Sequence, residues 1–333
     1  MRASATESTV NCPSVVVIGN FDGVHLGHQA VVRAAVKEAA EKGLQPRALT
    51  FDPHPQEVLG RGLRPKLTRL ERKLALLSRL GIEVRVERFT AALAELSPQE
   101  FAARVLVGKL GARTVLVGEN FRFGRGRSGD LRTLAELGRE LGFSARALEL
   151  AADSEGLFSS TRVRAALARG EVDAAERCLG RPHSVLGTVV SGDGRGRTIG
   201  VPTANLANVV EVLPPNGVYA CLVDREDADG RSEALALGVA NLGVRPTVSG
   251  APAAEGATGS VAAQGFSVEV HLLDFDGDLY GQHLRVHFVA RLRDEQKFPH
   301  LQALTQQIAA DIAVARGLLS GRNPDAGASG AWA

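Results

Sequence analysis

Short apolar runs alternate with stretches of helical length along the first half of the chain, and this alternation restricts the fold more than any other feature of the sequence. Continuous apolar runs predict strands that are buried on both faces of a sheet. Strands that alternate with helices are typical of a doubly wound parallel sheet, which binds ligands at the carboxyl ends of its strands. The predicted strands lie at residues 15–18, 48–51, 84–89 and 115–118, and the predicted helices at 28–42, 70–80, 131–141 and 161–169. A further helix is expected to begin at residues 97–100 (SPQE), which form a capping box.

The pattern changes near residue 181, where short β-like runs replace the alternation. Many short strands separated by Gly, Pro and Asn are typical of a small β-barrel. We therefore predict an α/β plus β architecture, with a parallel-sheet domain at residues 14–180 and a small β-barrel domain with a terminal helix at residues 183–318. Residues 1–13 and 319–333 are expected to be disordered, and residues 251–265 to form a mobile loop. The β-like runs lie at residues 185–190, 218–223, 234–239, 268–273 and 284–289, followed by a helix at about 300–315.

Composition excludes several classes of protein. The net charge of +2 gives no reason to expect nucleic acid or an anionic membrane as a partner. No apolar run approaches the roughly 18 residues of a spanning helix, and the N-terminal residues lack the apolar core of a secretory signal. The three cysteines lie far apart, without the spacing of a metal site. We expect a cytoplasmic protein with reduced thiols, whose oligomeric state the sequence leaves open.

The segment directly after the first predicted strand, residues 19–28 (GNFDGVHLGH), is the first candidate site. Its glycines allow close approach of the backbone to a ligand. His25 and His28 are three residues apart at a strand-to-helix junction, a spacing that places both imidazoles on one face. Because a helix N-terminus favours phosphate, two histidine donors there suit a triphosphate. The alternatives are helix-capping histidines and a metal pair, although a third metal ligand is not evident.

Two signatures resemble those of the nucleotidyltransferase superfamily. Residues 25–28 (HLGH) resemble its H-x-G-H signature, and residues 158–164 (FSSTRVR) resemble its I-S-S-T-x-x-R signature, with Phe158 in place of Ile. The resemblance implies adenylyl transfer, in which a phosphate attacks the α-phosphorus of ATP and pyrophosphate leaves. The implied catalytic residues are His25, His28 and Arg164, and the residues implied to bind ATP or its phosphates are Gly19, Phe21, Gly27, Ser159, Ser160 and Thr161.

A second glycine-rich segment, residues 192–205 (GDGRGRTIGVPTAN), opens the β-rich half. It is not a P-loop, and a Gly/Arg loop by itself is weak evidence for phosphate binding against a plain surface turn. Thr203 and Asn205 offer two oxygen ligands two residues apart, which suits Mg²⁺ bridging ATP phosphates. The segment resembles the riboflavin kinase motif G-x-G-R-G-x-x-x-G-x-P-T-A-N at every fixed position. This resemblance implies phosphate contacts by Gly194, Arg195, Gly196 and Arg197.

Glu269 is the candidate catalytic base. A hydroxyl group must lose its proton when it attacks the γ-phosphorus of ATP, so a general base accelerates this reaction. Strand alternation sets Glu269 on the face opposite Val268 and Val270. From the residues alone, an exposed strand glutamate without a role is an equal alternative; the resemblance to riboflavin kinases implies the position of the base.

Residues 15–316 together resemble the bacterial bifunctional riboflavin kinase/FAD synthetase family, with Leu157 as a departure where members often carry a basic residue. The resemblance implies that the second domain phosphorylates riboflavin to FMN and that the first domain adenylylates FMN to FAD. It implies ATP as the co-substrate and Mg²⁺ as the cofactor. From the residues alone, Asn120, Phe121 and Phe123, which follow the fourth predicted strand, can also be turn residues and core aromatics that bind no ligand. The implied flavin contacts are Asn120, Phe121 and Phe123 in the first domain, and Asn216, Tyr219 and Arg293 in the second.

Two alternatives remain at this point. One is another H-x-G-H adenylyltransferase, acting on nicotinamide mononucleotide or phosphopantetheine; such enzymes lack the P-T-A-N barrel. The other is a flavin-binding regulator without catalysis, which we expect to have lost His28, Thr203 or Glu269, and all three are present.

Overall fold

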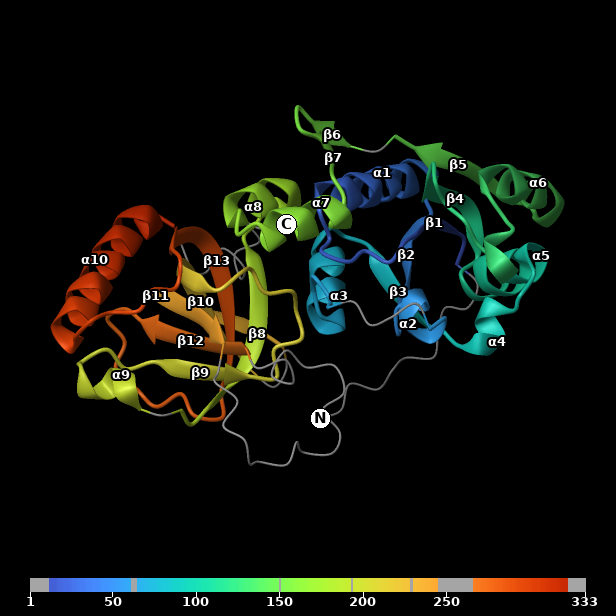
Figure 1. Cartoon of the computed structure of the whole chain (residues 1–333). Coiled ribbons are helices and arrows are strands. Elements are labelled where there is room, and N and C mark those ends of the chain that lie inside the picture. The colour runs from blue at the N-terminus through green and yellow to red at the C-terminus, as the bar shows by residue number, and fades with distance from the viewer. Residues whose placement is uncertain are drawn as a thin grey trace. The chain divides into compact units, whose positions relative to one another are not determined.

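The computed structural model describes residues 12–60, 65–149, 151–192, 194–227, 230–244 and 266–322. The chain divides into two compact units (Figure 1). The first unit holds residues up to 64 together with 70–158, and the second holds 65–69 together with the chain from 159 onward. The domain ranges 14–180 and 183–318 remain predictions. The loop at 251–265 and most of both chain ends lie outside the described residues.

A five-stranded sheet forms the centre of the first unit, and all its strand pairs are parallel, as predicted. Its order is β3-β2-β1-β4-β5, so the strand order reverses between β1 and β4. The fifth strand was not predicted, because its sequence SARAL is only partly buried and lacks an apolar run. The strands are β1 (Ser14–Ile18), β2 (Gln45–Asp52), β3 (Glu83–Arg88), β4 (Ala112–Gly118) and β5 (Ser144–Leu148).

Both faces of this sheet are covered by helices, which explains the continuous apolar runs. Val15 and Val17 of β1 pack in one core with α1 and α3, whereas Val16 and Ile18 pack in a second core with η1 and α6. A strand whose alternate residues enter two cores has no solvent face and needs no polar alternation. The helices are α1 (Leu26–Lys42), α2 (Pro55–Val58), α3 (Leu70–Arg79), α4 (Ala91–Ala94), α5 (Pro98–Phe101), the π-helix η1 (Ala102–Lys109), the 3₁₀-helix η2 (Arg125–Arg127) and α6 (Leu131–Leu141).

The predicted capping box is confirmed. The Ser97 hydroxyl accepts a hydrogen bond from the Glu100 amide at 3.2 Å, and the Ser97 amide donates to the Glu100 carboxylate at 2.9 Å. The helix that begins here continues as η1, a π-helix that the sequence pattern did not reveal. A short antiparallel pair, β6 (Ala152–Asp153) and β7 (Gly156–Leu157), completes the unit.

The second unit begins with two helices, α7 (Ser160–Ala168) and α8 (Val172–Leu179), followed by a closed barrel. The barrel order is β10-β11-β12-β9-β8-β13, and every strand pair is antiparallel. Five of its strands match predicted runs; the sixth, β9, is hidden in the glycine-rich segment. The barrel strands are β8 (His183–Val190), β9 (Ala204–Ala207), β10 (Gly217–Glu226), β11 (Ser232–Val244), β12 (Phe266–Leu272) and β13 (His283–Arg293), with the short helix α9 (Arg195–Thr198) between β8 and β9.

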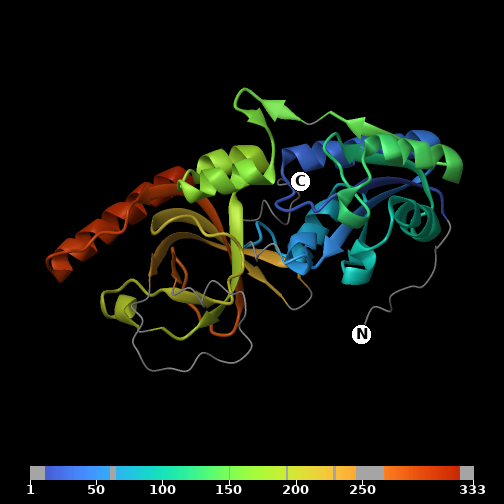
Figure 2. The same ribbon diagram turned by 45° about the vertical axis from the view of Figure 1, so that its right-hand side comes forward.

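The last helix, α10 (Leu301–Leu319), packs against β10, β11 and β13 (Figures 1 and 2). It is longer than predicted, because Ala315 and Leu319 both enter a core with Leu222 and Val289 of the barrel. In the parts of the chain that the structure describes, no helix combines the length and the apolar character that crossing a bilayer requires.

His183 makes the stability of the second unit pH-dependent. Burial lowers the pKa of His183 to about 4, partly opposed by its hydrogen bond to the Val212 carbonyl. The unfolded chain therefore takes up a proton below about pH 6.5 that the folded chain excludes until about pH 4. Stability is lost as the pH falls through this window. We expect the second unit to lose about 2 kcal/mol of unfolding free energy through His183 between pH 7 and pH 5.

Urea unfolding of the wild type and of His183→Gln at both pH values measures this contribution. Glutamine retains an amide donor for Val212 but does not titrate. The variant should show a smaller loss on acidification; an equal loss in both proteins would contradict the assignment.

Candidate active sites

The loop after β1 leaves the sheet at the point where strand order reverses, the usual ligand position in such folds. Phe21 and Val24 have positive φ angles of 50° and 41°. A β-branched residue in this region is a genuine outlier, and strained backbone of this kind concentrates at ligand-binding loops. The backbone strain supports a ligand site at this loop, and it is a signal that the sequence pattern does not contain.

The two histidines of this loop stack on each other. Their ring centroids lie 3.6 Å apart, and Phe21 meets the His28 ring edge-on at 5.2 Å. The His28 amide donates to Nδ1 of His25 at 3.3 Å, so His25 is also the N-cap of α1. His25 thus has the role that the capping alternative gave to both histidines, and the ring stacking brings the two imidazoles together. Their catalytic role remains a prediction.

Gly27 allows this stack to form. A Cβ atom at Gly27 would lie 3.1 Å from the His25 ring and 3.1 Å from the Phe158 carbonyl oxygen. Gly19, also a predicted phosphate contact, would meet the Phe21 ring at 3.1 Å in the same way. The glycines therefore serve close packing around the histidines, and their phosphate contacts remain predictions.

The second signature lies at the start of α7, in the second unit. Ser159 caps the helix, because its hydroxyl accepts from the Arg162 amide at 3.1 Å. Ser160 and Thr161 form the first turn of α7, and the Arg164 guanidinium donates to the Pro65 carbonyl at 2.6 Å. The histidines belong to the first unit. Leu157, the departure from the family, is half-exposed on β7.

The residues after β4 divide between surface and core. Asn120 is exposed, whereas Phe121 is half-buried and stacks on Phe123 at 5.5 Å between centroids. Phe123 is buried and packs against Phe101. Phe123 therefore has the core position that the alternative interpretation gave it, and the flavin contacts of all three residues remain predictions.

Lys73 of α3 is a residue of this region that sequence reasoning missed. Its ammonium reaches the Asn20 carbonyl at the end of β1 and the Thr50 hydroxyl at the end of β2. A lysine in an amphipathic helix ordinarily lies on the solvent face, so nothing in its sequence position signalled burial.

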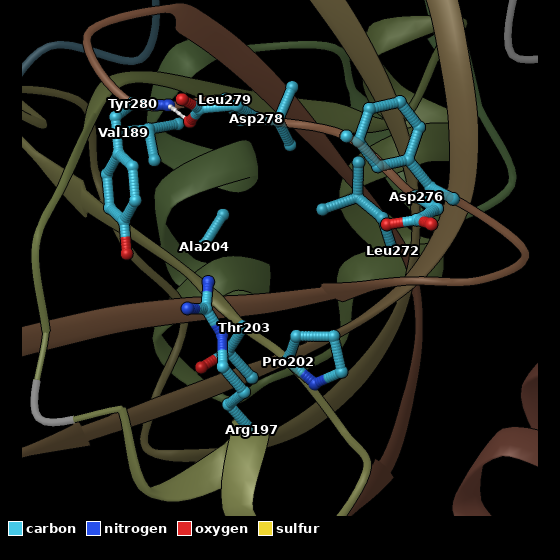
Figure 3. Close-up of a pocket in the computed structure, with 12 residues that line it drawn as sticks. Val189, Arg197, Pro202, Thr203, Ala204, Leu272, Asp276, Asp278, Leu279 and Tyr280 are labelled. Carbon is cyan, nitrogen blue, oxygen red and sulfur yellow. Dashed lines mark hydrogen bonds between the residues drawn. The ribbon is translucent and has the colours of Figure 1, made fainter.

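Two of the cavities in the second unit are neighbours, because they share a lining residue. The helix-side cavity, of about 760 Å³, lies between α10 and the barrel and includes Asn241, Glu269, Arg293, Leu304 and Ile308. The loop-side cavity, of about 630 Å³, includes Arg197, Asp276, Leu279 and Tyr280. Figure 3 shows Arg197 and Thr203 on one side of the loop-side cavity, with Asp278 and Leu279 on the other. Thr203 lines both cavities and marks their junction.

Barrel register sets Glu269 between two amides. Glu269 pairs with Asn205 of β9 on one side and with Asn241 of β11 on the other. Directly opposed residues of antiparallel strands present their side chains on one face, within reach of each other. Val268 and Val270 are buried, as the alternation predicted, and Glu269 is half-buried on the cavity side. Asn241 was not assigned from the sequence, because its pairing depends on the closed barrel.

Steric contacts explain why two positions of the glycine-rich segment, residues 192–205, are glycine. A Cβ atom at Gly192 would lie 2.2 Å from the Asn205 side chain, and one at Gly196 would lie 2.3 Å from the Val201 carbonyl. Gly194 has a φ of 69°, in the left-handed region. At Gly192 and Gly196 a larger side chain would clash, and the short helix α9 and the residues after it lead to Thr203 at the cavity junction. The side chain of Arg195 lies outside what the structure describes.

The oxygens of Thr203, at the cavity junction, and of Asn205, two residues further on, fit Mg²⁺ that retains phosphate and water ligands. Thr203 and Asn205 supply neutral oxygens, the ligand type that this ion takes in phosphate-transferring sites. Within the described ranges no group of three or more His, Cys, Asp or Glu side chains has the arrangement of a metal site. A divalent ion at Thr203 would thus depend on the oxygens of the nucleotide.

The three predicted flavin contacts of the second unit have different surroundings. Arg293 lines the helix-side cavity, is held by Asp311 at 2.9 Å, and lies over the Phe298 ring at 5.6 Å. Asn216 is half-buried, with its amide 3.5 Å from Glu295 of the cavity wall. Tyr219 is fully buried, donates to the Pro215 carbonyl at 2.6 Å, and does not line the cavity. Of the three, Arg293 lines the cavity, Asn216 contacts a residue of the cavity wall, and Tyr219 belongs to the barrel core.

Gly27→Ala tests the packing of the histidine pair. The new methyl group would press on the His25 ring and a backbone oxygen, and overpacking of this kind costs about 1–3 kcal/mol. We expect the first unit to unfold at lower temperature. Gly317→Ala is the matched control, because its Cβ would point into open space on α10; it should stabilise its helix by about 1 kcal/mol. A Gly27 variant as stable as the wild type would refute the close packing.

Comparisons with known proteins also divide the chain into two parts. A family model described as FAD synthetase matches residues 7–162, and one described as riboflavin kinase matches residues 179–319. The chain is 40% identical over 304 residues to the bifunctional riboflavin kinase/FMN adenylyltransferase of Escherichia coli K12, covering 91% of each chain. It is 42% identical to the enzyme of the same name from Pseudomonas fluorescens, covering 91% of this chain and 92% of the relative.

A solved structure from Streptococcus pneumoniae shares the fold over nearly the whole chain. The TM-score is 0.77 at 31% sequence identity, over 93% of this chain and 95% of that one. That protein is named a macrolide-efflux protein. The two family models and the two curated relatives agree on both halves of the chain. The chain therefore carries an FAD synthetase domain followed by a riboflavin kinase domain, and it belongs to the bifunctional riboflavin kinase/FMN adenylyltransferase family.

Proposed function

We propose that this chain makes FAD from riboflavin in two ATP-dependent steps, phosphorylation to FMN and adenylylation of FMN. The observation that carries the proposal is that Glu269 and Thr203 line the same helix-side cavity and that Thr203 also lines the loop-side cavity. We assign ATP to the loop-side cavity and riboflavin to the helix-side cavity. The γ-phosphoryl group then has to cross the junction between a candidate base and a candidate metal ligand.

In the kinase step, the 5′-oxygen of riboflavin forms a bond to the γ-phosphorus as the bond from that phosphorus to ADP breaks. Glu269 accepts the hydroxyl proton. Asn241, its strand neighbour, orients the carboxylate. Mg²⁺ held by Thr203 and Asn205 would neutralise charge on the phosphates. Apolar side chains of α10, Leu304 and Ile308, form the wall against which the isoalloxazine ring packs.

In the adenylyl transfer step, a phosphate oxygen of FMN forms a bond to the α-phosphorus of ATP and pyrophosphate leaves. The FMN phosphate is ionised at neutral pH, so this step requires no general base. The contribution of the protein is to position the reactants and to stabilise the negative charge that develops. His25 and His28, at the N-terminus of α1, are the proposed donors, together with the positive end of the helix dipole.

Glu269→Gln isolates the kinase step. The substitution keeps the size of the side chain and removes the base, so riboflavin phosphorylation should fall by about 10²–10⁴-fold. Adenylylation of added FMN should remain unchanged. Chromatography of the flavins after incubation with ATP and Mg²⁺ measures both. Glu233→Gln, on an exposed strand position paired with Arg225, is the matched control. Normal phosphorylation by the Glu269 variant would remove the base from the mechanism.

His28→Ala isolates the second step. Loss of one well-placed charge-stabilising donor costs about 10²–10³-fold in rate, so FAD formation from FMN should fall by that factor. FMN formation from riboflavin should continue. His283→Ala, at an exposed histidine of β13, serves as control. Adenylylation within a few-fold of wild type would exclude this role for His28. A wild-type chain that binds riboflavin and converts none of it would instead favour the non-catalytic regulator.

A further inference from the structure

Lys73 ties three elements of the first unit together at the carboxyl edge of the sheet. The residue is only 8% exposed. Its ammonium lies 3.2 Å from the Asn20 carbonyl and 3.1 Å from the Thr50 hydroxyl. The Thr50 hydroxyl also donates to the same Asn20 carbonyl at 3.3 Å. Burial of a charged group is costly unless it is hydrogen-bonded, so these acceptors hold the ammonium at one place.

The Asn20 carbonyl begins the strained loop that contains the histidine pair. This carbonyl accepts two hydrogen bonds from one side, and its peptide bond is trans. In a planar trans peptide the N–H of the next residue points away from the carbonyl oxygen. The Phe21 amide is therefore directed away from Lys73. Across the described ranges this amide donates no hydrogen bond to the protein.

Phe21 is held in that orientation on its other side as well. Its ring is buried and meets the His28 ring edge-on at 5.2 Å. Its carbonyl accepts from the Val24 amide at 3.1 Å, which closes the turn. The positive φ of Phe21 is unfavourable in isolation. Contacts on both sides of the peptide keep the backbone in this conformation. Among these contacts, the hydrogen bond from Lys73 is the one that a charged group makes.

We propose that Lys73 is a positioning residue for adenylyl transfer. By holding the Asn20 carbonyl, it fixes the Phe21 amide as a hydrogen-bond donor to a non-bridging oxygen of the ATP α-phosphate. Negative charge accumulates on these oxygens in the transition state, and a preoriented donor stabilises it without reorganisation. The inference rests on the proposed adenylyltransferase function and adds the residue that orients one of its donors. Lys73 itself does not touch the substrate.

Lys73→Met removes the ammonium and keeps the length of the side chain. Adenylylation of FMN should fall by about 10–100-fold, since a misplacement of about 1 Å at a reacting group costs up to 10²-fold. Riboflavin phosphorylation by the second unit of the same chain should stay within about twofold of wild type, because a substitution far from a site has little effect on it. The second activity is therefore an internal control. Lys37→Met, at an exposed lysine of α1 that pairs with Glu41 at 3.9 Å, should alter neither activity.

Phosphorothioate substrates separate positioning from loss of folded enzyme. Sulfur is a poor acceptor, so the diastereomer of ATPαS whose sulfur faces the Phe21 amide should react more slowly than ATP. The ratio of the two rates does not depend on the fraction of active protein. In Lys73→Met this ratio should shrink towards one for that diastereomer only. An unchanged ratio, or adenylylation at the wild-type rate, would overturn the proposal.

Two further variants keep the test decisive where Lys73→Met does not fold. Lys73→Arg retains a cationic donor and should recover most of the rate and of the thio ratio. Thr50→Val removes one anchor of the network and should lower both, by less than Lys73→Met. Wild-type ratios in both variants would refute the role of the network. A wild-type chain that makes no FAD would sink the adenylyltransferase function itself, whereas FAD formation unaffected at Lys73 would sink only this inference.

Discussion

Closure of the barrel in one register is the constraint on which the kinase site depends. Side chains alternate along a strand, so a slip of β12 by one residue would move Glu269 into the core and Val268 into the cavity. Val268 and Val270 are buried and Glu269 is not, which gives the observed register a hydrophobic driving force. That register is also what sets Glu269 between Asn205 and Asn241.

The short strand β9 belongs to this constraint. It has four residues, yet it joins β8 to β12 and completes the barrel. It begins directly after Thr203, so the same turn that brings the hydroxyl to the cavity junction also starts the closing strand. Gly192 and Gly196 allow the tight approach that this requires. One fixed segment therefore serves both the fold and the proposed chemistry.

In the first unit, a parallel sheet instead of a barrel holds the backbone of the candidate site in place. β1 is buried on both faces and central in the sheet, which makes its end a rigid base. The loop that follows carries positive φ angles at Phe21 and Val24, and it is held by ring stacking, a helix cap and Lys73. In both units, glycines permit close approach while buried polar side chains fix the backbone that a phosphate would meet.

Local sequence determined much of this protein, including four of the five strands of the parallel sheet, the capping box at Ser97 and the residues of both signatures. These features are readable because continuous apolar runs, capping residues and tight-turn glycines express local physics. Tertiary structure alone decided which of these residues meet. Tyr219 lies on a strand that is buried on both faces, so its sequence gave no sign that it enters the barrel core instead of the cavity wall. Asn241 reaches its site through strand pairing, and Lys73 through helix packing. The four-residue strand β9 forms because it pairs with β8 and β12. Such placements depend on contacts between residues distant in the chain, and no local pattern encodes them.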